Sequence, residues 1–318
     1  MATERSRFAQ RLTEAAACAV YPWIGRGDKI RADRAAVDAM EQVLSSAPYR
    51  TCIVVGEGAK DGAPMLPPGA CYGPAGGARY DIAVDPLDAT TRTAAGADRA
   101  TTVVAVAPQG TLRDLAAAHY LMKVVGPPAL RGCLPLDAPV PVLLRAAADA
   151  LGRPIAALTL AVQQRPRHAD LIQAITQTGA HVRPFDDGEI PLTLDVVTGH
   201  GPADLLWGIG GAPEGVLAAA MAQAAGAAFH ARLAPQSADE KTRVTEAGYS
   251  TGTLRAKDLV RTEDVAVAVS AVTDGPRLRG VRATPEAYVV QTCVLAPGTA
   301  KMHETTYSRS STEGRSSP

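Results

Sequence analysis

The sequence predicts a layered α/β fold. From about residue 140 onward, helical and strand patterns alternate along the chain, and this alternation is typical of sheets that are covered by helices. Before residue 110, short β-branched runs end in Gly or Pro, which predicts buried strands that lead into loops. The chain has 318 residues, of which 47% are hydrophobic, so it is long enough to bury a large core in one domain or two subdomains.

The composition argues against several classes of protein. Lys and Arg together number 32, as do Asp and Glu, and no dense basic run is present, so neither nucleic acid nor an anionic membrane is an expected partner. No window reaches the ~18 consecutive apolar residues of a membrane span, and the N-terminal residues lack the apolar core of a signal peptide. A soluble, cytoplasmic protein is therefore expected.

The five cysteines are scattered, odd in number and never arranged as C-x-x-C. This spacing argues against a disulfide framework and against a structural zinc site, and it fits a reducing compartment. The sequence therefore predicts neither cross-links nor a metal held by cysteine.

Two amphipathic helices are predicted near the N-terminus. Apolar side chains recur at helical spacing over 4–22 and again over 33–47. Glycines at 25 and 27 separate the two helices, and Asp33 stands where an N-cap or first-turn acid belongs.

Short β-branched and apolar runs predict three strands in the same half of the chain. These runs cover 51–55, 80–84 and 101–106. Gly and Pro dominate 61–79 between the first two strands, which predicts a long surface loop. Long loops in compact domains are often functional.

Helices and strands then alternate. The expected helices cover 140–151, 168–178 and 213–224. The expected strands cover 155–162, 181–185, 203–208, 265–272 and 288–295. Residues 308–318 are of low complexity and are expected to form a disordered tail.

Acidic side chains stand where predicted strands give way to loops. Asp85 ends an apolar strand, Pro86 turns the backbone away from the strand ladder, and Asp88 follows three residues after Asp85. Both carboxylates can converge beyond the strand end, with the Leu87 carbonyl and the Thr90 hydroxyl nearby. Hard divalent cations such as Mg²⁺ prefer such oxygen ligands, and two of them can hold the attacking and leaving oxygens of a phosphoryl transfer.

Two further acids share this placement. Glu57 lies in the run 54–58, and Glu214 follows the glycine-rich run 208–211. Pro213 at a helix start places Glu214 in the first turn, where an acid is favoured whether or not it has a function. A turn with helix caps likewise explains the D-P-x-D tetrapeptide alone as well as a metal site does.

Taken together, these motifs resemble one family. Residues 56–58 read G-E-G, 81–90 read D-I-A-V-D-P-L-D-A-T, and 207–216 read W-G-I-G-G-A-P-E-G-V. They follow one another in the order found in class II (GlpX-type) fructose-1,6-bisphosphatases, within the metal-dependent, lithium-sensitive sugar and inositol phosphatase superfamily. The resemblance extends in order from about residue 3 to residue 307.

The resemblance implies an α-β-α-β-α sandwich of the sugar phosphatase type, with two mixed sheets between helices. It also implies a phosphomonoesterase that depends on Mg²⁺ or Mn²⁺ and releases the 1-phosphate of fructose 1,6-bisphosphate or a related ketose bisphosphate, such as sedoheptulose 1,7-bisphosphate. A homo-oligomer, either a dimer or a tetramer, is implied as well. We expect an N-terminal subdomain over 1–150 with most of the metal site. We expect a C-terminal subdomain over 151–307 with the sugar-phosphate grip and Glu214.

Individual residues match positions that have roles in the family. The matching metal ligands are Asp33, Glu57, Asp85, Asp88 and Glu214, with the carbonyl of Leu87. Thr90 and Asp33 match residues that position the attacking water. The matching phosphosugar-binding positions are Lys29, Asp88, Ala89, Thr90, Tyr120, Arg165, Arg167, Asp187 and Glu189. Arginine forks suit a phosphate that is not cleaved.

Simpler explanations hold for some of these residues when each is taken alone. Asp33 is then a helix N-cap, and Arg165 and Arg167 are solvated surface charges. His168 is better explained as a structural hydrogen-bonding residue than as a metal ligand.

Several departures from the family pattern surround the expected site. The family reads G-E-G-E-x-D-E-A-P-M-L where this chain reads G-E-G-A-K-D-G-A-P-M-L, so Ala59 and Gly62 replace acids. Asp88 is one methylene shorter than the family's glutamate, and Ala89 replaces a glycine. If the backbone there needs φ > 0, alanine costs about 1 kcal/mol or more.

These departures leave two alternatives open. One is a paralogue specialised for another phosphosugar or for an inositol or nucleoside-derived phosphate. The other is a catalytically weak, regulatory protein that binds sugar phosphates. A panel of phosphorylated substrates distinguishes both from a fructose-1,6-bisphosphatase.

Overall fold

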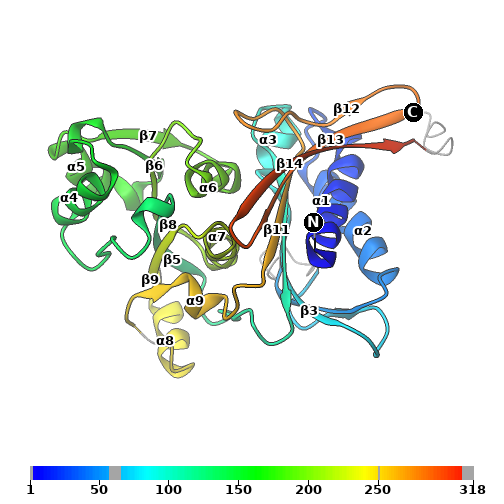
Figure 1. Ribbon diagram of the computed structural model, residues 1–318, viewed down its shortest axis with the longest axis horizontal. Coiled ribbons are helices and arrows are strands. Elements are labelled where there is room, and N and C mark those ends of the chain that lie inside the picture. The colour runs from blue at the N-terminus through cyan, green and yellow to red at the C-terminus, as the bar shows by residue number, and fades with distance from the viewer. Residues whose placement is uncertain (1–2, 57–65, 250, 310–318) are drawn as a thin grey trace.

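The computed structural model describes residues 3–56, 66–249 and 251–309, and in this part of the chain two sheets stand side by side (Figure 1). The strands of the first sheet are β1 (Arg50–Val55), β2 (Cys71–Tyr72), β3 (Arg79–Asp88), β4 (Thr101–Pro108), β11 (Ala266–Ala271), β12 (Arg282–Ala283), β13 (Ala287–Ala296) and β14 (Thr299–Ser308). They are ordered β12-β13-β11-β4-β3-β1-β2, with β14 paired to β13.

The second sheet is smaller. Its strands are β5 (Tyr120–Gly126), β6 (Thr159–Gln163), β7 (His181–Phe185), β8 (Leu205–Gly211), β9 (Ala228–Leu233) and β10 (Leu254–Arg255). They are ordered β10-β9-β5-β8-β6-β7. Both sheets mix parallel and antiparallel pairs, as expected from the sequence.

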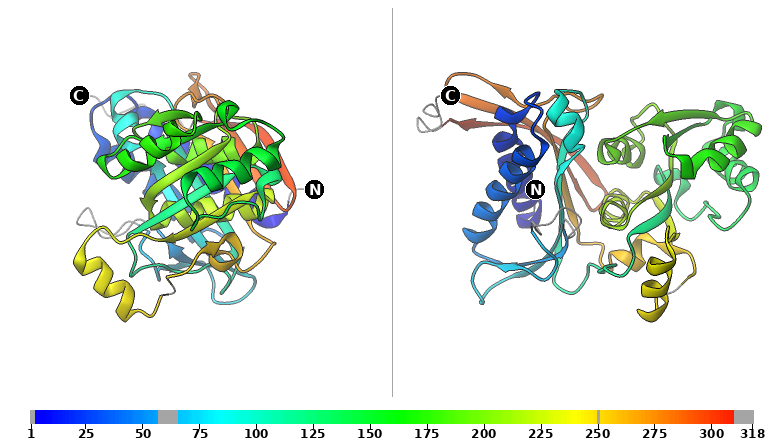
Figure 2. Two further views of the ribbon diagram at one scale, coloured as in Figure 1. Left: turned by 90° about the vertical axis from the view of Figure 1, so that its left-hand side faces the viewer. Right: turned by 180° about the vertical axis from the view of Figure 1, so that it is seen from behind.

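Helices form three further layers around the sheets. The helices are α1 (Glu4–Val20), α2 (Lys29–Ser45), α3 (Thr90–Ala95), α4 (Val140–Leu151), α5 (Ala169–Gln177), α6 (Glu189–Thr198), α7 (Ala212–Ala225), α8 (Ala238–Glu246) and α9 (Ala256–Leu259). Short 3₁₀ turns are η1 (Tyr21–Trp23), η3 (Pro128–Leu130), η4 (Ile155–Ala157) and η5 (Pro166–His168). Helices α1 and α2 cover the outer face of the first sheet, α4 and α5 lie on the far side of the second, and α6 and α7 lie between the sheets (Figures 1 and 2). The predicted α-β-α-β-α sandwich is confirmed.

The apolar run of β4 shows why the first sheet is covered on both faces. Val103 and Ala105 belong to the core shared with α6 and α7, whereas Val104 and Val106 pack with α1 and α2. Successive side chains of a strand point to opposite faces, so a strand buried on both faces reads as a continuous hydrophobic run.

Helix α7 is buried around most of its circumference. Every residue from Gly215 to Ala222 is buried, and the helix contacts strands of both sheets. A helix that is apolar on all sides belongs in the interior of a protein, which matches the central layer. Neither α7 nor any other helix in the described ranges is long and apolar enough to cross a membrane.

The sheets divide the chain differently from the expected subdomains. The chain leaves the first sheet after β4 and builds the second sheet, but β11 pairs with β4 again and β13 and β14 extend that sheet. The first sheet is therefore assembled from both ends of the chain (Figure 1). Ser308, the first residue of the expected tail, ends β14, and residues 310–318 lie outside the described residues.

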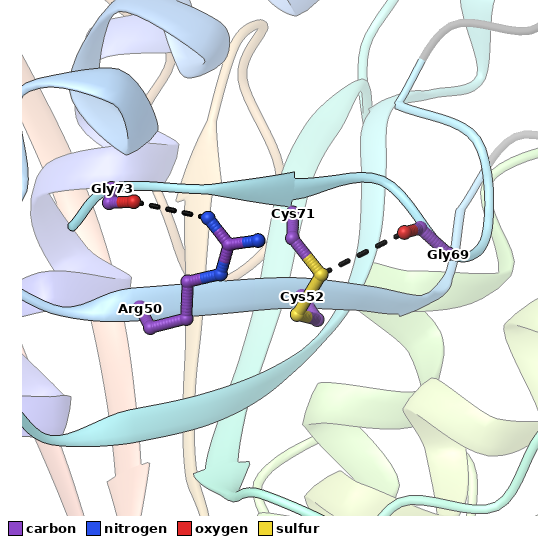
Figure 3. Close-up of a disulfide and its surroundings, with 5 residues drawn as sticks. All are labelled: Arg50, Cys52, Gly69, Cys71 and Gly73. Carbon is purple, nitrogen blue, oxygen red and sulfur yellow. Dashed lines mark hydrogen bonds between the residues drawn. A yellow bond between two sulfur atoms is a disulfide. The ribbon is translucent and has the colours of Figure 1, made fainter. Parts of the chain in front are cut away.

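The expectation of no cross-link is wrong for one pair of cysteines. A disulfide joins Cys52 on β1 to Cys71 on β2 (Figure 3). The two residues are 19 positions apart in sequence, but the antiparallel register of β1 and β2 places them directly opposite each other. The pairing follows from strand register, which spacing along the sequence does not reveal.

Other departures from the expected elements are local. Helix α2 begins at Lys29 with Asp28 as its N-cap, so Asp33 lies in the second turn and is not a cap. The short strand β2 lies within the expected loop over 61–79. Residues 155–157 form a 3₁₀ turn before β6. The expected elements do not include strands β5, β9, β10, β12 and β14 or helices α6, α8 and α9.

Candidate active site

Strand β3 ends in a bulge that presents two carboxylates. In its pairing with β4, Asp85 lies opposite Val103 and Asp88 opposite Thr101, so the step between the acids contains one residue more on β3 than on β4. Pro86 cannot donate to the ladder, which explains the irregularity. The Leu87 amide donates to Oδ1 of Asp85 at 3.1 Å.

The residue that follows the bulge is held in a left-handed conformation. Ala89 has a φ of 67° and a ψ of 49° and is the N-cap of α3, whose first residue is Thr90. The sequence-based concern about a positive φ at this position is confirmed. For an alanine, the left-handed conformation costs about 1–2 kcal/mol relative to the right-handed one, so this turn is strained.

A cavity of about 280 Å³ lies where the end of β3 faces the second sheet. It is lined by Asp88, Tyr120, Gln163, Arg165, Arg167, Asp187, Gly188, Glu189, Gly211 and Glu214. Candidates from distant parts of the sequence thus meet in one place. The Ile190 amide at the start of α6 donates to Oδ2 of Asp88 at 3.2 Å and connects the strand end to the middle layer.

Sequence reasoning missed Gln163 among the lining residues. It is the last residue of β6, and its side-chain amide donates to the Asp186 carbonyl at 3.2 Å. The signal that could have found it is a polar residue at a strand end, two positions before Arg165.

The acidic side of the cavity concentrates like charges. Asp88 is buried, and this burial together with the nearby carboxylates of Asp187, Glu189 and Glu214 raises its pKa well above the ordinary value. Neighbouring carboxylates disfavour one another's ionised forms. In the described ranges, no Lys or Arg forms an ion pair with Asp88, Asp187 or Glu214.

Oxygen donors of this kind fit a hard divalent cation. The described residues alone, however, contain no group of three or more His, Cys, Asp or Glu side chains that could enclose a metal ion. Glu57, the fifth expected acidic ligand, lies outside the described residues together with Ala59 and Gly62. The carboxylates therefore fit the chemistry of a metal site, and the described part of that site is incomplete.

The other expected site residues do not line this cavity. Asp85, Leu87, Ala89 and Thr90 form the bulge and turn around Asp88. Lys29 is exposed at the start of α2, and Asp33 is buried one turn later on the same helix.

The cationic side of the cavity is held by hydrogen bonds. Arg167 donates from Nε and Nη2 to the Ile209 carbonyl at 3.1 and 2.9 Å, and from Nη2 to Oε1 of Gln163 at 3.2 Å. Its guanidinium also lies 5.3 Å from the centroid of the Tyr120 ring, within cation–π range. Arg165 is exposed at the N-cap of η5.

His168 is a structural hydrogen-bonding residue, as the sequence analysis favoured. The Ile209 amide donates to Nε2 at 2.7 Å, so Nδ1 carries the proton and donates to the Gln163 carbonyl at 2.7 Å. Burial lowers the pKa of His168, which favours this neutral form. The imidazole thereby fixes the end of η5, next to Arg167, against β8.

The glycines of β8 provide space for functional side chains. A Cβ at Gly208 would lie 3.1 Å from Nε2 of His168, and a Cβ at Gly211 would overlap the carboxylate of Glu214. Glu214 lies in the first turn of α7, as predicted. Side chains of the site thus pack directly against the backbone of β8, which explains why this strand is rich in glycine.

Comparisons with known proteins agree with this geometry. A sequence model of bacterial, glpX-encoded fructose-1,6-bisphosphatases matches residues 7–307. The chain is 36% identical over 285 residues to fructose-1,6-bisphosphatase 1 class 2 of Escherichia coli K12, which covers 85% of this chain and 84% of that protein. The class 2 fructose-1,6-bisphosphatases of Escherichia coli O6:H1 and Shigella flexneri match with the same identity and coverage. All residues that line the cavity lie within the matched range.

Proposed function

The chain belongs to the family of bacterial, glpX-encoded fructose-1,6-bisphosphatases, and from this membership we propose that it releases the 1-phosphate of fructose 1,6-bisphosphate or of a related ketose bisphosphate. The reaction class is the hydrolysis of a phosphoric monoester. The observation that supports this site for that reaction is the cavity itself, whose lining combines carboxylates from β3 and α7 with the guanidinium groups of Arg165 and Arg167.

The two sides of the cavity suit the two ends of a sugar bisphosphate. Arg165 and Arg167 can bind the phosphate that is retained, because guanidinium forks match phosphate oxygens. Asp187 and Glu189 can accept hydrogen bonds from sugar hydroxyls. The phosphate to be cleaved would then lie toward Asp88 and Glu214.

Members of this family depend on a metal ion, and we propose Mg²⁺ or Mn²⁺ for this chain. The residues that would hold it are Asp33, Glu57, Asp85, Asp88 and Glu214, with the carbonyl of Leu87. When bound, the ion supplies positive charge next to the reacting phosphate.

The residues of the chain itself would contribute orientation. The Thr90 hydroxyl and the Asp33 carboxylate are proposed to orient the attacking water opposite the leaving sugar oxygen, since phosphoryl transfer depends on alignment and charge stabilisation. Asp88, held by the Ile190 amide, would keep this reacting end fixed relative to α6.

The decisive experiment measures phosphate release with Mg²⁺ and with Mn²⁺. The substrates are fructose 1,6-bisphosphate, sedoheptulose 1,7-bisphosphate, fructose 6-phosphate, glycerol phosphate and inositol 1-phosphate. A ketose bisphosphate should be turned over best, and Asp85→Asn should abolish activity in a folded protein. Preference for another phosphate would favour the specialised paralogue, and binding without turnover would favour the regulatory protein.

Three further properties are proposed from the family resemblance: membership of the lithium-sensitive phosphatase superfamily, a homo-oligomer (dimer or tetramer), and a cytoplasmic location. The disulfide between Cys52 and Cys71 is the observation that bears against the last, because structural disulfides are rare in reducing compartments. Thiol titration of protein taken directly from cells tests this point.

A further inference from the structure

Lys123 places an ammonium group in the interior of the second sheet. It lies on β5 opposite Gly208 of β8, and its side chain is 1% exposed. Its Nζ lies 2.8 Å from Oε1 of Glu189, the first residue of α6, whose side chain is 13% exposed and lines the cavity. The contact is an ion pair without the alignment of a hydrogen bond. A charge buried this deeply requires a partner, because loss of hydration strongly disfavours an unpaired ion.

Gly210 provides the space for this ion pair. A Cβ at position 210 would overlap Nζ of Lys123 and lie 2.7 Å from Oε2 of Glu189. Nζ of Lys123 and Oε2 of Glu189 therefore both lie against the bare backbone of β8, while Oε1 of Glu189 contacts Nζ. The pair thus lies between β5, β8 and the start of α6.

Glu189 differs from the other acids of the cavity in its charge balance. Asp88, Asp187 and Glu214 line the same space, and none of them has an ion-pair partner among the described residues. Glu189 therefore differs from these three acids, because Lys123 neutralises its charge. A divalent cation favours carboxylates with uncompensated charge, whereas a sugar hydroxyl needs only an acceptor oxygen.

We propose that Lys123 is a positioning residue that reserves Glu189 for the hydroxyl groups of the sugar and keeps it out of the metal-binding set. This inference rests on the proposed function, since it assumes a phosphosugar in the cavity. Lys123 does not contact the substrate in this arrangement. It acts by holding Oε1 of Glu189 and thereby setting the direction of the carboxylate.

The test compares sugar binding with metal binding in Lys123→Met. Calorimetry measures the dissociation constants for Mn²⁺ and, in protein saturated with Mn²⁺, for fructose 6-phosphate. We expect fructose 6-phosphate to bind at least tenfold more weakly, with an equal rise in KM for fructose 1,6-bisphosphate. Mn²⁺ should bind as tightly as to the wild-type protein or more tightly, because Glu189 is then no longer neutralised. Lys241→Met, at an exposed position on α8, is the matched control and should alter neither constant.

A second variant avoids the folding problem that an unpaired buried carboxylate creates. In Gly210→Ala, the three heavy atoms nearest to the added methyl group all belong to the ends of the Lys123 and Glu189 side chains and none to the backbone, so the protein should fold with the pair displaced. The same selective loss of fructose 6-phosphate affinity is expected. A melting temperature close to that of the wild-type protein would show that the loss is local.

Each result has a defined meaning. Weaker binding of Mn²⁺ and fructose 6-phosphate to the same extent would overturn the inference, because the pair would then support the whole site. Unchanged fructose 6-phosphate affinity in both variants, or a wild-type protein that does not bind this sugar, would overturn it as well. A wild-type protein that binds fructose 6-phosphate but cleaves no ketose bisphosphate would instead contradict the proposed function.

Discussion

Among the residues that line the cavity, Asp88 and Glu214 have no ion-pair partner in the described ranges, whereas Arg167 is held by hydrogen bonds and Glu189 is paired with Lys123 behind it. Asp88 carries a raised pKa as a consequence of its burial and of its acidic neighbours. Arg167 instead donates three hydrogen bonds and lies over an aromatic ring.

This difference in charge compensation indicates that the two sets of side chains have different functions. Uncompensated buried carboxylates destabilise the folded state, and such strain persists where a bound positive charge can relieve it. Side chains that must recognise a fixed shape gain from being held in advance, because less conformational freedom is lost on binding. The acidic side is thus suited to a cation and the opposite side to a sugar phosphate.

The largest expected effect comes from Asp88→Asn. We expect phosphate release to fall by about 100-fold or more, as for the loss of a key electrostatic group, while the free energy of unfolding at pH 7 stays equal or rises. The amide can still accept the Ile190 hydrogen bond and removes one of the repelling charges. Steady-state kinetics and urea unfolding provide the two measurements.

Asp239→Asn, at an exposed position on α8, is the matched control for Asp88→Asn. It should preserve both activity and stability. An Asp88→Asn protein with full activity, or one that loses stability, would contradict the view that uncompensated charge on this side serves function at the expense of stability.

His168→Leu tests the opposite side of the cavity. The change leaves the Ile209 amide and the Gln163 carbonyl without their partner, which should cost about 2–4 kcal/mol of stability. It should also raise KM more than it lowers kcat, because Arg167 depends on the Ile209 carbonyl for its position. Thermal unfolding and kinetics measure both effects.

The exposed His181 on β7 provides the comparison variant, His181→Leu, which should behave as the wild type. If His168→Leu lowered kcat alone and left KM unchanged, the histidine would affect the phosphate that is cleaved and not the binding of the sugar phosphate by Arg165 and Arg167.

Asp195 on α6 is a buried acid outside the cavity, and it tests whether uncompensated charge has the same cost elsewhere. Burial raises its pKa to about 6, although Arg277 and Arg183 act in the opposite direction. The folded state therefore binds this proton more tightly than the unfolded state does, so the stability contributed by this group falls as the pH rises from about 4 to 6.

We expect Asp195→Asn to gain up to about 3 kcal/mol relative to the wild type above pH 6. The gain should shrink toward zero below about pH 3, where the wild-type carboxyl is protonated in both states. Urea unfolding of both proteins across this pH range gives the difference directly. A gain that does not vary with pH would contradict burial as its cause.

Ala89→Gly is expected to have the smallest effect. Ala89 has a φ of 67°, which glycine adopts without strain, but glycine also adds freedom to the unfolded chain. The net gain should be about 1 kcal/mol or less. A rise in the melting temperature without a change in KM would mean that the strain is tolerated and does not serve substrate selection.

The strand-end acids and the elements that carry them could be predicted from sequence. Pro86 was expected to end the strand after Asp85, and it does interrupt the ladder, but β3 continues through a bulge to Asp88 because Asp88 pairs again with β4. Likewise, Pro213 at a helix start fixes Glu214 in the first turn of α7. The uniformly apolar run of that helix agrees with its place between two sheets.

Contacts between distant segments could not be predicted in this way. Lys123 lies 66 residues before Glu189, and their ion pair depends on how β5, β8 and α6 pack together. The disulfide of Cys52 and Cys71 likewise depends on the pairing of β1 with β2.

The sequence by itself determined the layered fold, the interruption of the strand ladder between two acids, and the glycine-rich strand, because each depends on backbone preferences and on hydrophobic period within a few residues. Only the tertiary structure decided which charges are compensated. Compensation depends on distances of a few ångströms between side chains from separate elements, and both Coulomb energy and desolvation change steeply over such distances. That is why Glu189 and Asp88, both acids of one cavity, differ in their partners.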